Sequence, residues 1–437
     1  EWLGSIAGNT SKLTNLDKNH VIVLDLFSEV SPRNSALEGA STPWIWNMLH
    51  NFGGRMGLDA NPEKVSQNIP NTYQNSNYMV GIGMTPEAIE NSPMAYELLW
   101  DMTWSKDPID FRQWSQDYAK RIYGGTNEDI EEVWNILLET GYNRKDSYYQ
   151  GAPESVINAR PTTNFTSASS WGHSTINYDK EKLERAVYLL AKNHDEFKDS
   201  PAFIYDLSDI TRQLISNSAQ EYHAAMVSAY QNGNLAEFEI LSDMFLEMIL
   251  LQDQILSTNS DFLVGNWIEK ARTMLDDSDD WTKDLFEFNA RDLITTWGGL
   301  KNANGGGLRD YSNRQWAGIT KDYYYPRWQK WIEDVKTAME TGSAVATTNW
   351  FLMEWQWANE KSDEGNDYST TPANLDLSQL AMKAYNDYSI SSLKQLVGNV
   401  EEKENIALGK NVSASINSLV SNPTTNLTDG NKETGWV

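Results

Sequence analysis

The chain contains no cysteine among its 437 residues. This absence excludes disulfide bonds, thiolate-bound metal ions and a cysteine nucleophile. The five histidines show no His-x-x-x-His spacing, so we expect no metal site of that kind. No Gly-x-Ser-x-Gly motif marks a serine nucleophile, and no glycine-rich segment ends in the Gly-Lys-Ser/Thr of a phosphate-binding loop. Several classes of hydrolase and nucleotide-binding protein are thereby excluded.

Basic residues and long apolar runs are also scarce. The 35 Lys and Arg are outnumbered by 61 Asp and Glu, which gives a net charge of −26. Such an acidic surface repels phosphate, so we expect no nucleic-acid partner. No apolar run approaches the roughly 18 residues that a membrane-spanning helix needs, so we expect no membrane span.

Aromatic residues, by contrast, are abundant: 18 Trp, 20 Tyr and 12 Phe. Tryptophan offers a flat apolar face with one hydrogen-bond donor. Sugars present flat C–H faces rimmed by hydroxyls, so an acidic, aromatic-rich chain suits a protein that handles carbohydrate. The other interpretation is that large helical cores simply use tryptophan.

The chain divides into three stretches that differ in their pattern of apolar and polar residues: 1–108, 109–400 and 401–437. It begins at Glu1 without a methionine or a targeting segment. It stops shortly after a turn signal, Asp429-Gly430. We therefore expect an excerpt of a longer protein.

The first stretch contains three short, strongly apolar runs, typical of buried parallel strands. Polar residues follow each run, and in a (β/α)8 barrel the chemistry lies at the C-terminal ends of the strands. Three strands cannot close such a barrel, so we expect its C-terminal part, with the other strands upstream. The runs are Val21–Leu24, Trp44–Leu49 and Tyr78–Ile82.

The second stretch predicts a large all-α domain. Phe111, Trp114, Tyr118 and Ile122 follow the spacing of an amphipathic helix. A polar segment from 143 to 178 is unusually long for a loop, which is uncommon unless the loop serves a site or is mobile. The other predicted helices cover 130–138, 183–191, 203–230, 235–256, 261–274, 281–297, 311–341 and 349–360.

The third stretch begins with a charged linker, Glu401-Glu402-Lys403-Glu404. Two segments after it, 405–410 and 412–415, are typical of β-strands, and Asn422-Pro423 and Asp429-Gly430 supply turns.

Glu87 is the sharpest catalytic candidate. It follows Thr85-Pro86, which predicts a helix capped by Thr85 with Glu87 in its first turn. There the carboxylate either complements the helix dipole or faces the pocket as a nucleophile at the end of a barrel strand.

Polar residues after the other two predicted strands are further candidates. His50-Asn51 could hydrogen-bond a polar ligand, or His50 could be satisfied within the barrel rim. Asp25 and Glu29 could form an acid/base couple, or each could be salt-bridged to a Lys or Arg.

A glycine-rich segment lies between two predicted helices, with Trp297-Gly298-Gly299 at its start and Asp310-Tyr311 at its end. It is either a flexible connection or a loop that presents Trp297 and Tyr311 to a neighbouring domain.

These segments resemble glycoside hydrolase family 89, the α-N-acetylglucosaminidases. The resemblance covers about residues 1–395. It rests on Val23-Leu24-Asp25-Leu26-Phe27-Ser28-Glu29, Trp46-Asn47-Met48-Leu49-His50-Asn51-Phe52-Gly53-Gly54, Val80-Gly81-Ile82-Gly83-Met84-Thr85-Pro86-Glu87, Phe262-Leu263-Val264-Gly265-Asn266-Trp267, Trp297-Gly298, Asp310-Tyr311-Ser312-Asn313-Arg314-Gln315 and Tyr324-Tyr325-Pro326-Arg327-Trp328.

The resemblance implies a (β/α)8 barrel followed by an all-α domain. It implies a retaining exo-α-N-acetylglucosaminidase that uses two carboxylates and no cofactor. Glu87 matches the nucleophile, and Trp297, Leu308 and Tyr311 match residues that line the sugar pocket. Motifs at the barrel rim add Asp25, His50 and Asn51 to that pocket.

The family's acid/base glutamate lies on an Asn-Glu motif upstream of the Asp-Leu-Phe motif, and this chain lacks that region. Asn127-Glu128 and Asn359-Glu360 contain the dipeptide but fall among the predicted helices. We therefore expect this excerpt to be inactive by itself. The alternatives are an inactive glycan-binding homologue and a retaining glycosidase of another sugar specificity.

The tail from Asn405 resembles the start of a family 32 carbohydrate-binding module, a discoidin-like β-sandwich that is truncated here. Asp429 and Thr434 match positions near the structural calcium of such modules. These resemblances imply a secreted or cell-surface protein, of bacterial type, that acts on glycans with terminal α-linked N-acetylglucosamine.

Overall fold

The computed structural model describes residues 11–88, 92–144, 151–275, 279–304 and 307–404. The chain forms two compact units, Glu1–Ser389 and Ile390–Val437. No helix in these described ranges is long and apolar enough to cross a membrane.

Three parallel strands form the sheet of the first unit, in the order β1 (Val23–Asp25), β2 (Trp44–Met48) and β3 (Met79–Met84). The predicted strands and their parallel direction are thus confirmed, with ends shifted by one or two residues. Helix α2 (Asn34–Gly39) connects β1 to β2, and α3 (Pro62–Gln74) connects β2 to β3. Because parallel strands share one edge for their C-terminal ends, residues after all three strands meet there.

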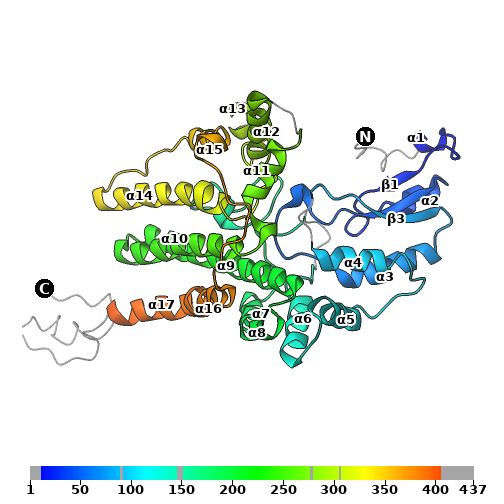
Figure 1. Ribbon diagram of the computed structural model, residues 1–437, viewed down its shortest axis with the longest axis horizontal. Helices are drawn as coiled ribbons and strands as arrows, with labels where there is room; N and C mark the ends of the chain where they lie inside the picture. The colour runs from blue at the N-terminus through cyan, green and yellow to red at the C-terminus, as the bar shows by residue number, and fades with distance from the viewer. Residues whose placement is uncertain (1–10, 89–91, 145–150, 276–278, 305–306, 405–437) are drawn as a thin grey trace, which may run out of the picture. The chain divides into compact units, whose positions relative to one another are not determined.

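The two faces of this sheet differ in character. Trp44 and Trp46 of β2 are fully buried, and α3 and α4 (Pro93–Asp101) lie along one side of the sheet (Figure 1). Ile45 and Asn47 point to the opposite face, where Gly83 of β3 approaches Asn47 so closely that a Cβ would lie 2.4 Å from Asn47 Oδ1.

Beyond residue 110 the first unit is helical, as the apolar spacing predicts. Side-chain caps begin several helices: Asp110 accepts hydrogen bonds from the first turn of α5, and Asn127 does so for α6. Gly124 ends α5 with φ +78°. The helices are α5 (Phe111–Tyr123), α6 (Glu128–Glu139), α7 (Lys180–Lys192), α8 (His194–Phe197), α9 (Pro201–Gln231), α10 (Leu235–Ser257), α11 (Val264–Arg272), α12 (Asp280–Leu293), α13 (Leu300–Asn304), α14 (Tyr325–Thr341), α15 (Trp350–Ala358) and α16 (Leu377–Tyr388).

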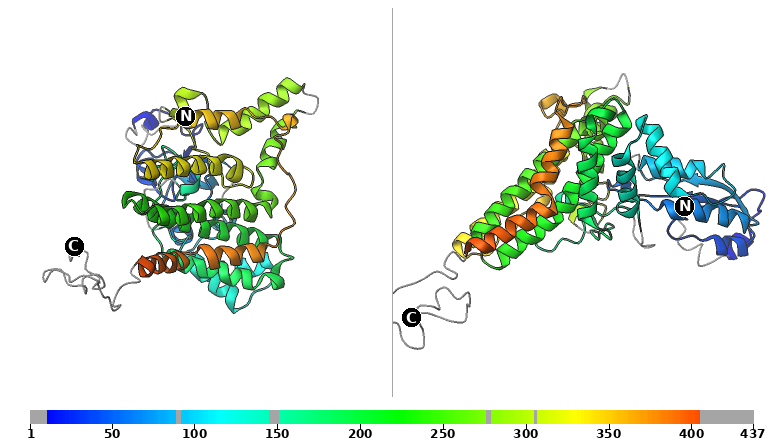
Figure 2. Two further views of the ribbon diagram at one scale, coloured as in Figure 1. Left: turned by 90° about the vertical axis from the view of Figure 1, so that its left-hand side faces the viewer. Right: turned by 90° about the horizontal axis from the view of Figure 1, so that it is seen from below.

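The long helices α9 and α10 lie side by side and form the centre of this bundle (Figures 1 and 2). Helix α14 packs on α10, and α16 packs on α7, α9 and α10. Trp328 of α14 contacts Phe245 of α10 edge to face, with ring centroids 4.9 Å apart. Many tryptophans therefore serve the core, which is one of the two interpretations of the composition.

Two predicted features differ in the structure, the start of the helix at 311 and the linker at 401–404. Residues 311–319 do not begin a long helix: the chain is irregular there, and α14 starts only at Tyr325, after a π-helical turn, η4 (Thr320–Tyr324). The polar segment, described from residue 151, is irregular, as predicted, apart from one 3-10 turn, η2 (Val156–Asn158). Residues 151–161 are mostly buried, whereas most residues from 162 to 178 are partly or fully exposed. The expected linker at 401–404 is the end of α17 (Ile390–Glu404), in the second unit. The predicted β segments from 405 onward lie outside the described residues.

Candidate active site

Glu87 lies three residues after the end of β3, exposed at the edge where the strands end. The predicted helix start is wrong: Glu87 sits in a bend, and α4 begins at Pro93 with Ser92 as its cap. Thr85 does not cap a helix, because its hydroxyl donates to Leu26 O (2.9 Å) and its N–H to Met48 O (2.9 Å). Thr85 instead ties the end of β3 to the residues that follow β1 and to the end of β2.

Two donors hold the Glu87 carboxylate through the same oxygen. The backbone N–H of Gly53 donates to Oε2 (2.7 Å), and the hydroxyl of Tyr311 donates to it as well (2.5 Å). Burial raises the pKa of Tyr311, and the hydrogen bond to Glu87 raises it further, so this hydroxyl stays a donor. A residue from the helical region thus binds a carboxylate that follows strand β3.

The turn η1 (Phe52–Gly54) requires its glycines. Gly53 has φ +65°, and a Cβ there would lie 2.3 Å from Tyr311 O. Gly54 has φ +62°, and a Cβ there would lie 2.2 Å from the Cβ of Ala88. Arg314 fixes the turn from the other side, since its Nη1 donates to Gly53 O (2.9 Å) and to Ser312 O (2.7 Å). The close approach of the two segments therefore depends on glycine.

The glycine-rich segment brings Trp297 against Tyr311. Their rings meet edge to face with centroids 5.8 Å apart. Trp297 has φ +50°, a conformation that a non-glycine residue rarely adopts, and its N–H donates to Asp292 O (2.8 Å). Leu308 is half-buried, and its carbonyl accepts from the N–H of Tyr311 (3.0 Å). The segment thus places Tyr311 on the Glu87 carboxylate and Trp297 against Tyr311. The presentation of Trp297 to the neighbouring domain stays a prediction.

His50 and Asn51 form the backbone turn between β2 and Gly53. His50 Nε2 accepts from Ser92 N (3.2 Å), which requires a neutral imidazole. Burial lowers the pKa of His50 to about 3, and the nearby Arg144 guanidinium adds to this effect. Asn51 donates to the carbonyl of Arg55 within its own turn. The structure shows both side chains binding neighbouring protein groups, and their place in a sugar pocket stays a prediction.

Asp25 and Glu29 both bind backbone N–H groups. Asp25 Oδ2 accepts from Arg33 N (2.8 Å). Glu29 Oε1 accepts from Leu49 N (3.0 Å) and His50 N (2.6 Å), which holds the end of β2. The expected salt bridges are absent among the described residues, and the acid/base couple gains no support. The role of Asp25 in the sugar pocket also stays a prediction.

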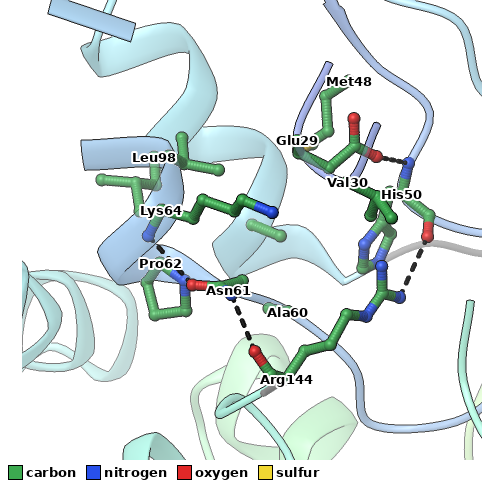
Figure 3. A pocket seen from close by; sticks show the side chains of 12 residues that line it. Glu29, Val30, Met48, His50, Ala60, Asn61, Pro62, Lys64, Leu98 and Arg144 are labelled. Atoms are coloured by element: carbon green, nitrogen blue, oxygen red, sulfur yellow. Dashed lines mark hydrogen bonds between the residues drawn. The ribbon is translucent and has the colours of Figure 1, made fainter. Parts of the chain in front are cut away.

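Glu29 lines a small cavity together with His50, Lys64 and Arg144 (Figure 3). Glu87, Trp297 and Tyr311 do not line it, so this cavity does not include the surroundings of the Glu87 carboxylate. Burial raises the pKa of Glu29 to about 7, against its ordinary 4.5, although backbone N–H donors and the positive charge of Arg144 oppose the rise.

This raised pKa predicts a pH-dependent stability. Between pH 4.5 and 7 the native protein holds a proton on Glu29 that the unfolded chain has released. The free energy of unfolding therefore falls as the pH rises through that window, by at most about 3 kcal/mol from this group. Glu29→Gln keeps an oxygen acceptor without the charge. We compare the free energy of unfolding of this variant with that of wild type at two pH values. The variant's value minus the wild-type value should be about 2 kcal/mol larger at pH 8 than at pH 5.

Urea unfolding at both pH values measures this difference. Glu63→Gln, an exposed residue in the first turn of α3, is the control and should show no such change. Equal effects of Glu29→Gln at pH 5 and pH 8 would contradict the assignment.

Three residues that support the site received no role from the sequence: Arg55, Glu154 and Arg314, the last within the Asp310–Gln315 motif. Arg55 pairs with Glu154, and both side chains are fully buried. Two signals were available in the sequence. An arginine follows the Gly53-Gly54 turn directly, and Glu154 lies within the polar segment, whose length is uncommon unless the loop serves a site or is mobile.

Both main parts of the chain match domains of one family of known proteins. Residues 7–106 match the tim-barrel domain of alpha-N-acetylglucosaminidase (NAGLU), and residues 114–397 match its C-terminal domain. The human alpha-N-acetylglucosaminidase is 33% identical over 332 residues, which cover 74% of this chain and 42% of that protein.

Solved structures extend the likeness. A family 89 glycoside hydrolase from Clostridium perfringens, in complex with PUGNAc, is 56% identical with a TM-score of 0.88, over 90% of this chain and 44% of that one. A variant with two glutamates replaced by glutamine, in complex with its substrate GlcNAc-α-1,4-galactose, is 57% identical with a TM-score of 0.85, over 87% of this chain and 43% of that one. The chain spans less than half the length of each of these relatives. It belongs to the α-N-acetylglucosaminidase family, glycoside hydrolase family 89.

Proposed function

We propose that the full-length protein is a retaining exo-α-N-acetylglucosaminidase and that Glu87 is its nucleophile. The observation that carries the proposal is the environment of the Glu87 carboxylate. Both donors bind Oε2, and within the described ranges no group donates to Oε1. One oxygen is thus held in place while the other is available to attack a sugar.

The substrate's stereochemistry explains why the protein must supply this group. In an α-linked N-acetylglucosamine, the 2-acetamido group is cis to the leaving oxygen. It therefore cannot attack C1 from the opposite face. Glu87 takes that role in the proposed mechanism, as one of two carboxyl groups about 5 to 5.5 Å apart.

The reaction then proceeds in two displacements. Glu87 attacks C1 and forms an ester, while the bond from C1 to the leaving oxygen breaks and an acid protonates that oxygen. The conjugate base then deprotonates a water molecule, which attacks C1 and releases Glu87 as a carboxylate with net retention. We propose that the acid/base group lies on the upstream Asn-Glu motif of the family. The solved relative with two glutamates replaced supports a pair of carboxyl groups.

The activity test uses the full-length gene product with a panel of 4-nitrophenyl glycosides. We expect hydrolysis of the α-N-acetylglucosaminide, with the α-anomer formed first by NMR, and no hydrolysis of the β-anomer. Binding of N-acetylglucosamine without turnover would favour an inactive glycan-binding homologue. Turnover of another α-glycoside would indicate a different sugar specificity.

Trp297 is proposed to support one face of the bound sugar, because it is half-buried and packs beside Tyr311 near Glu87. An aromatic contact is worth about 1 to 2 kcal/mol, so Trp297→Ala should raise KM by roughly 5- to 30-fold. We expect kcat to change less than about threefold, since the contact exists in both ground and transition states.

Steady-state kinetics on the aryl glycoside measures both constants. Trp281→Ala provides the matched control, because Trp281 on α12 is 71% exposed. An unchanged KM for Trp297→Ala would contradict the proposed contact.

We also propose that the residues from 405 begin a carbohydrate-binding β-sandwich, with structural calcium near Asp429 and Thr434 once the module is complete. The likeness of Asn405–Lys410 to such modules supports this proposal. A secreted or cell-surface location suits the proposed glycan substrates. Leu308, Asp25, His50 and Asn51 remain proposed pocket residues.

A further inference from the structure

One buried carboxylate, Glu154, organises the polar segment that begins at residue 151. Its Oε2 accepts from Ala168 N (2.7 Å) and Ser169 N (3.0 Å), and its Oε1 accepts from Ser169 Oγ (2.7 Å). The turn also encloses the carboxylate from the other side, since a Cβ on Gly172 would lie 1.9 Å from Oε2. The segment is therefore folded around Glu154.

The same carboxylate contacts two segments of the candidate site. Arg55 Nη1 lies 3.3 Å from Oε1, and Asn313 Nδ2 donates to that oxygen (3.1 Å). Arg55 lies two residues after Gly53, and Asn313 lies two residues after Tyr311. Glu154 thus joins the two segments that supply the donors to Glu87.

Arg55 links Glu154 to Tyr311. Its guanidinium lies over the ring of Tyr311, 5.7 Å from the centroid. A cation in this position is attracted to the ring and makes the phenolic O–H a stronger donor. Without Glu154 the charge of Arg55 would be buried with its carboxylate partner removed, and the guanidinium would be expected to move.

We propose that Glu154 is a positioning residue for the nucleophile: it holds Arg55 over Tyr311 and thereby fixes the hydrogen bond from Tyr311 to Glu87. This proposal rests on the proposed function. It differs from a purely structural role because it predicts an effect on the ionisation of Glu87, transmitted through Tyr311.

The test uses Glu154→Gln in the full-length gene product, assayed on the aryl α-N-acetylglucosaminide. We expect kcat to fall by about 10- to 100-fold, because the site loses its fixed geometry. The acid limb of the pH profile of kcat/KM reports the free enzyme's nucleophile. We expect this limb to move up by about 0.5 to 1 pH unit, because a carboxylate that loses a donor ionises less readily.

A double-mutant cycle identifies the route. Tyr311→Phe should move the acid limb in the same direction, and Glu154→Gln should then add no further shift in that background. Arg55→Lys keeps a positive charge near Glu154 and the bonds of Glu154 to Ala168 and Ser169, so we expect the turn to stay folded. It is the second variant if Glu154→Gln fails to fold. Because an ammonium lacks the planar guanidinium, we expect Arg55→Lys to produce the same shift.

Glu287→Gln is the matched control, because Glu287 is also fully buried and paired with an arginine, Arg291, within α12. It should lower the unfolding temperature without moving the acid limb. Two results would overturn the proposal and leave the proposed function standing. One is an acid limb that does not move in Glu154→Gln. The other is a Glu154→Gln shift that is as large in the Tyr311→Phe background as in the wild-type background. Absence of hydrolysis by the wild type would overturn both.

Discussion

Glu87→Ala is expected to abolish turnover in the full-length gene product, with a fall in kcat of at least about 10⁴-fold. Removing a covalent nucleophile costs this much because no other group can form the ester intermediate. The fold should be unaffected, since Glu87 is exposed and its two donors, Gly53 N and Tyr311 OH, can bind water instead. The measurement is steady-state kinetics on 4-nitrophenyl α-N-acetylglucosaminide, with thermal unfolding as the check on folding.

Rescue by azide makes this experiment specific. A small anion can occupy the space left by the Glu87 side chain and attack C1 directly. A single displacement inverts the configuration, so the product should be the β-glycosyl azide. Glu63→Ala is the control and should retain full activity, because Glu63 is exposed on α3. A fall in kcat of less than about a hundredfold would overturn the nucleophile assignment.

The second large effect is expected for Gly53→Ala. The substitution combines a positive φ of +65° with a Cβ placed 2.3 Å from Tyr311 O. The backbone of one segment must therefore shift. We expect a loss of about 3 kcal/mol or more in the free energy of unfolding, together with at least about a hundredfold fall in kcat, because Gly53 N and Tyr311 OH both move away from Glu87.

Gly124→Ala separates the two causes. Gly124 also has a positive φ, +78°, but a Cβ there would have no atom of a non-adjacent residue within 4 Å. The free energy of unfolding of this variant should fall by only about 1 kcal/mol, and its activity should be unchanged. Urea unfolding and kinetics on both variants give the comparison. Similar losses in the two variants would show that the approach of Tyr311 to the turn is not what requires Gly53.

The sequence predicts the framework of the site because local patterns determine it. Continuous apolar runs predict the three buried strands, and the polar residues after them predict the edge where Glu87 lies. The amphipathic spacing predicts most helices of the second stretch. Glycines around 298–307 indicate the loop that carries Trp297 and Tyr311.

Other features depend on contacts between distant residues, which local patterns do not report. Thr85-Pro86 predicts a helix start, but the Thr85 hydroxyl binds Leu26 O instead. Residues 311–319 have helical spacing, but Tyr311 and Arg314 bind Glu87 and Gly53 O across 224 and 261 residues of chain. Arg55 and Glu154 pair across 99 residues, and neither lies in a motif.

The measurement that tests the account most directly is covalent labelling of the full-length gene product with a 5-fluoro derivative of N-acetylglucosaminyl fluoride. Such a reagent slows both displacements, while its good leaving group lets the first proceed, so the ester intermediate accumulates. Peptide mass spectrometry should place one fluorinated sugar on the carboxylate of Glu87. A label on any other carboxylate would contradict the central claim.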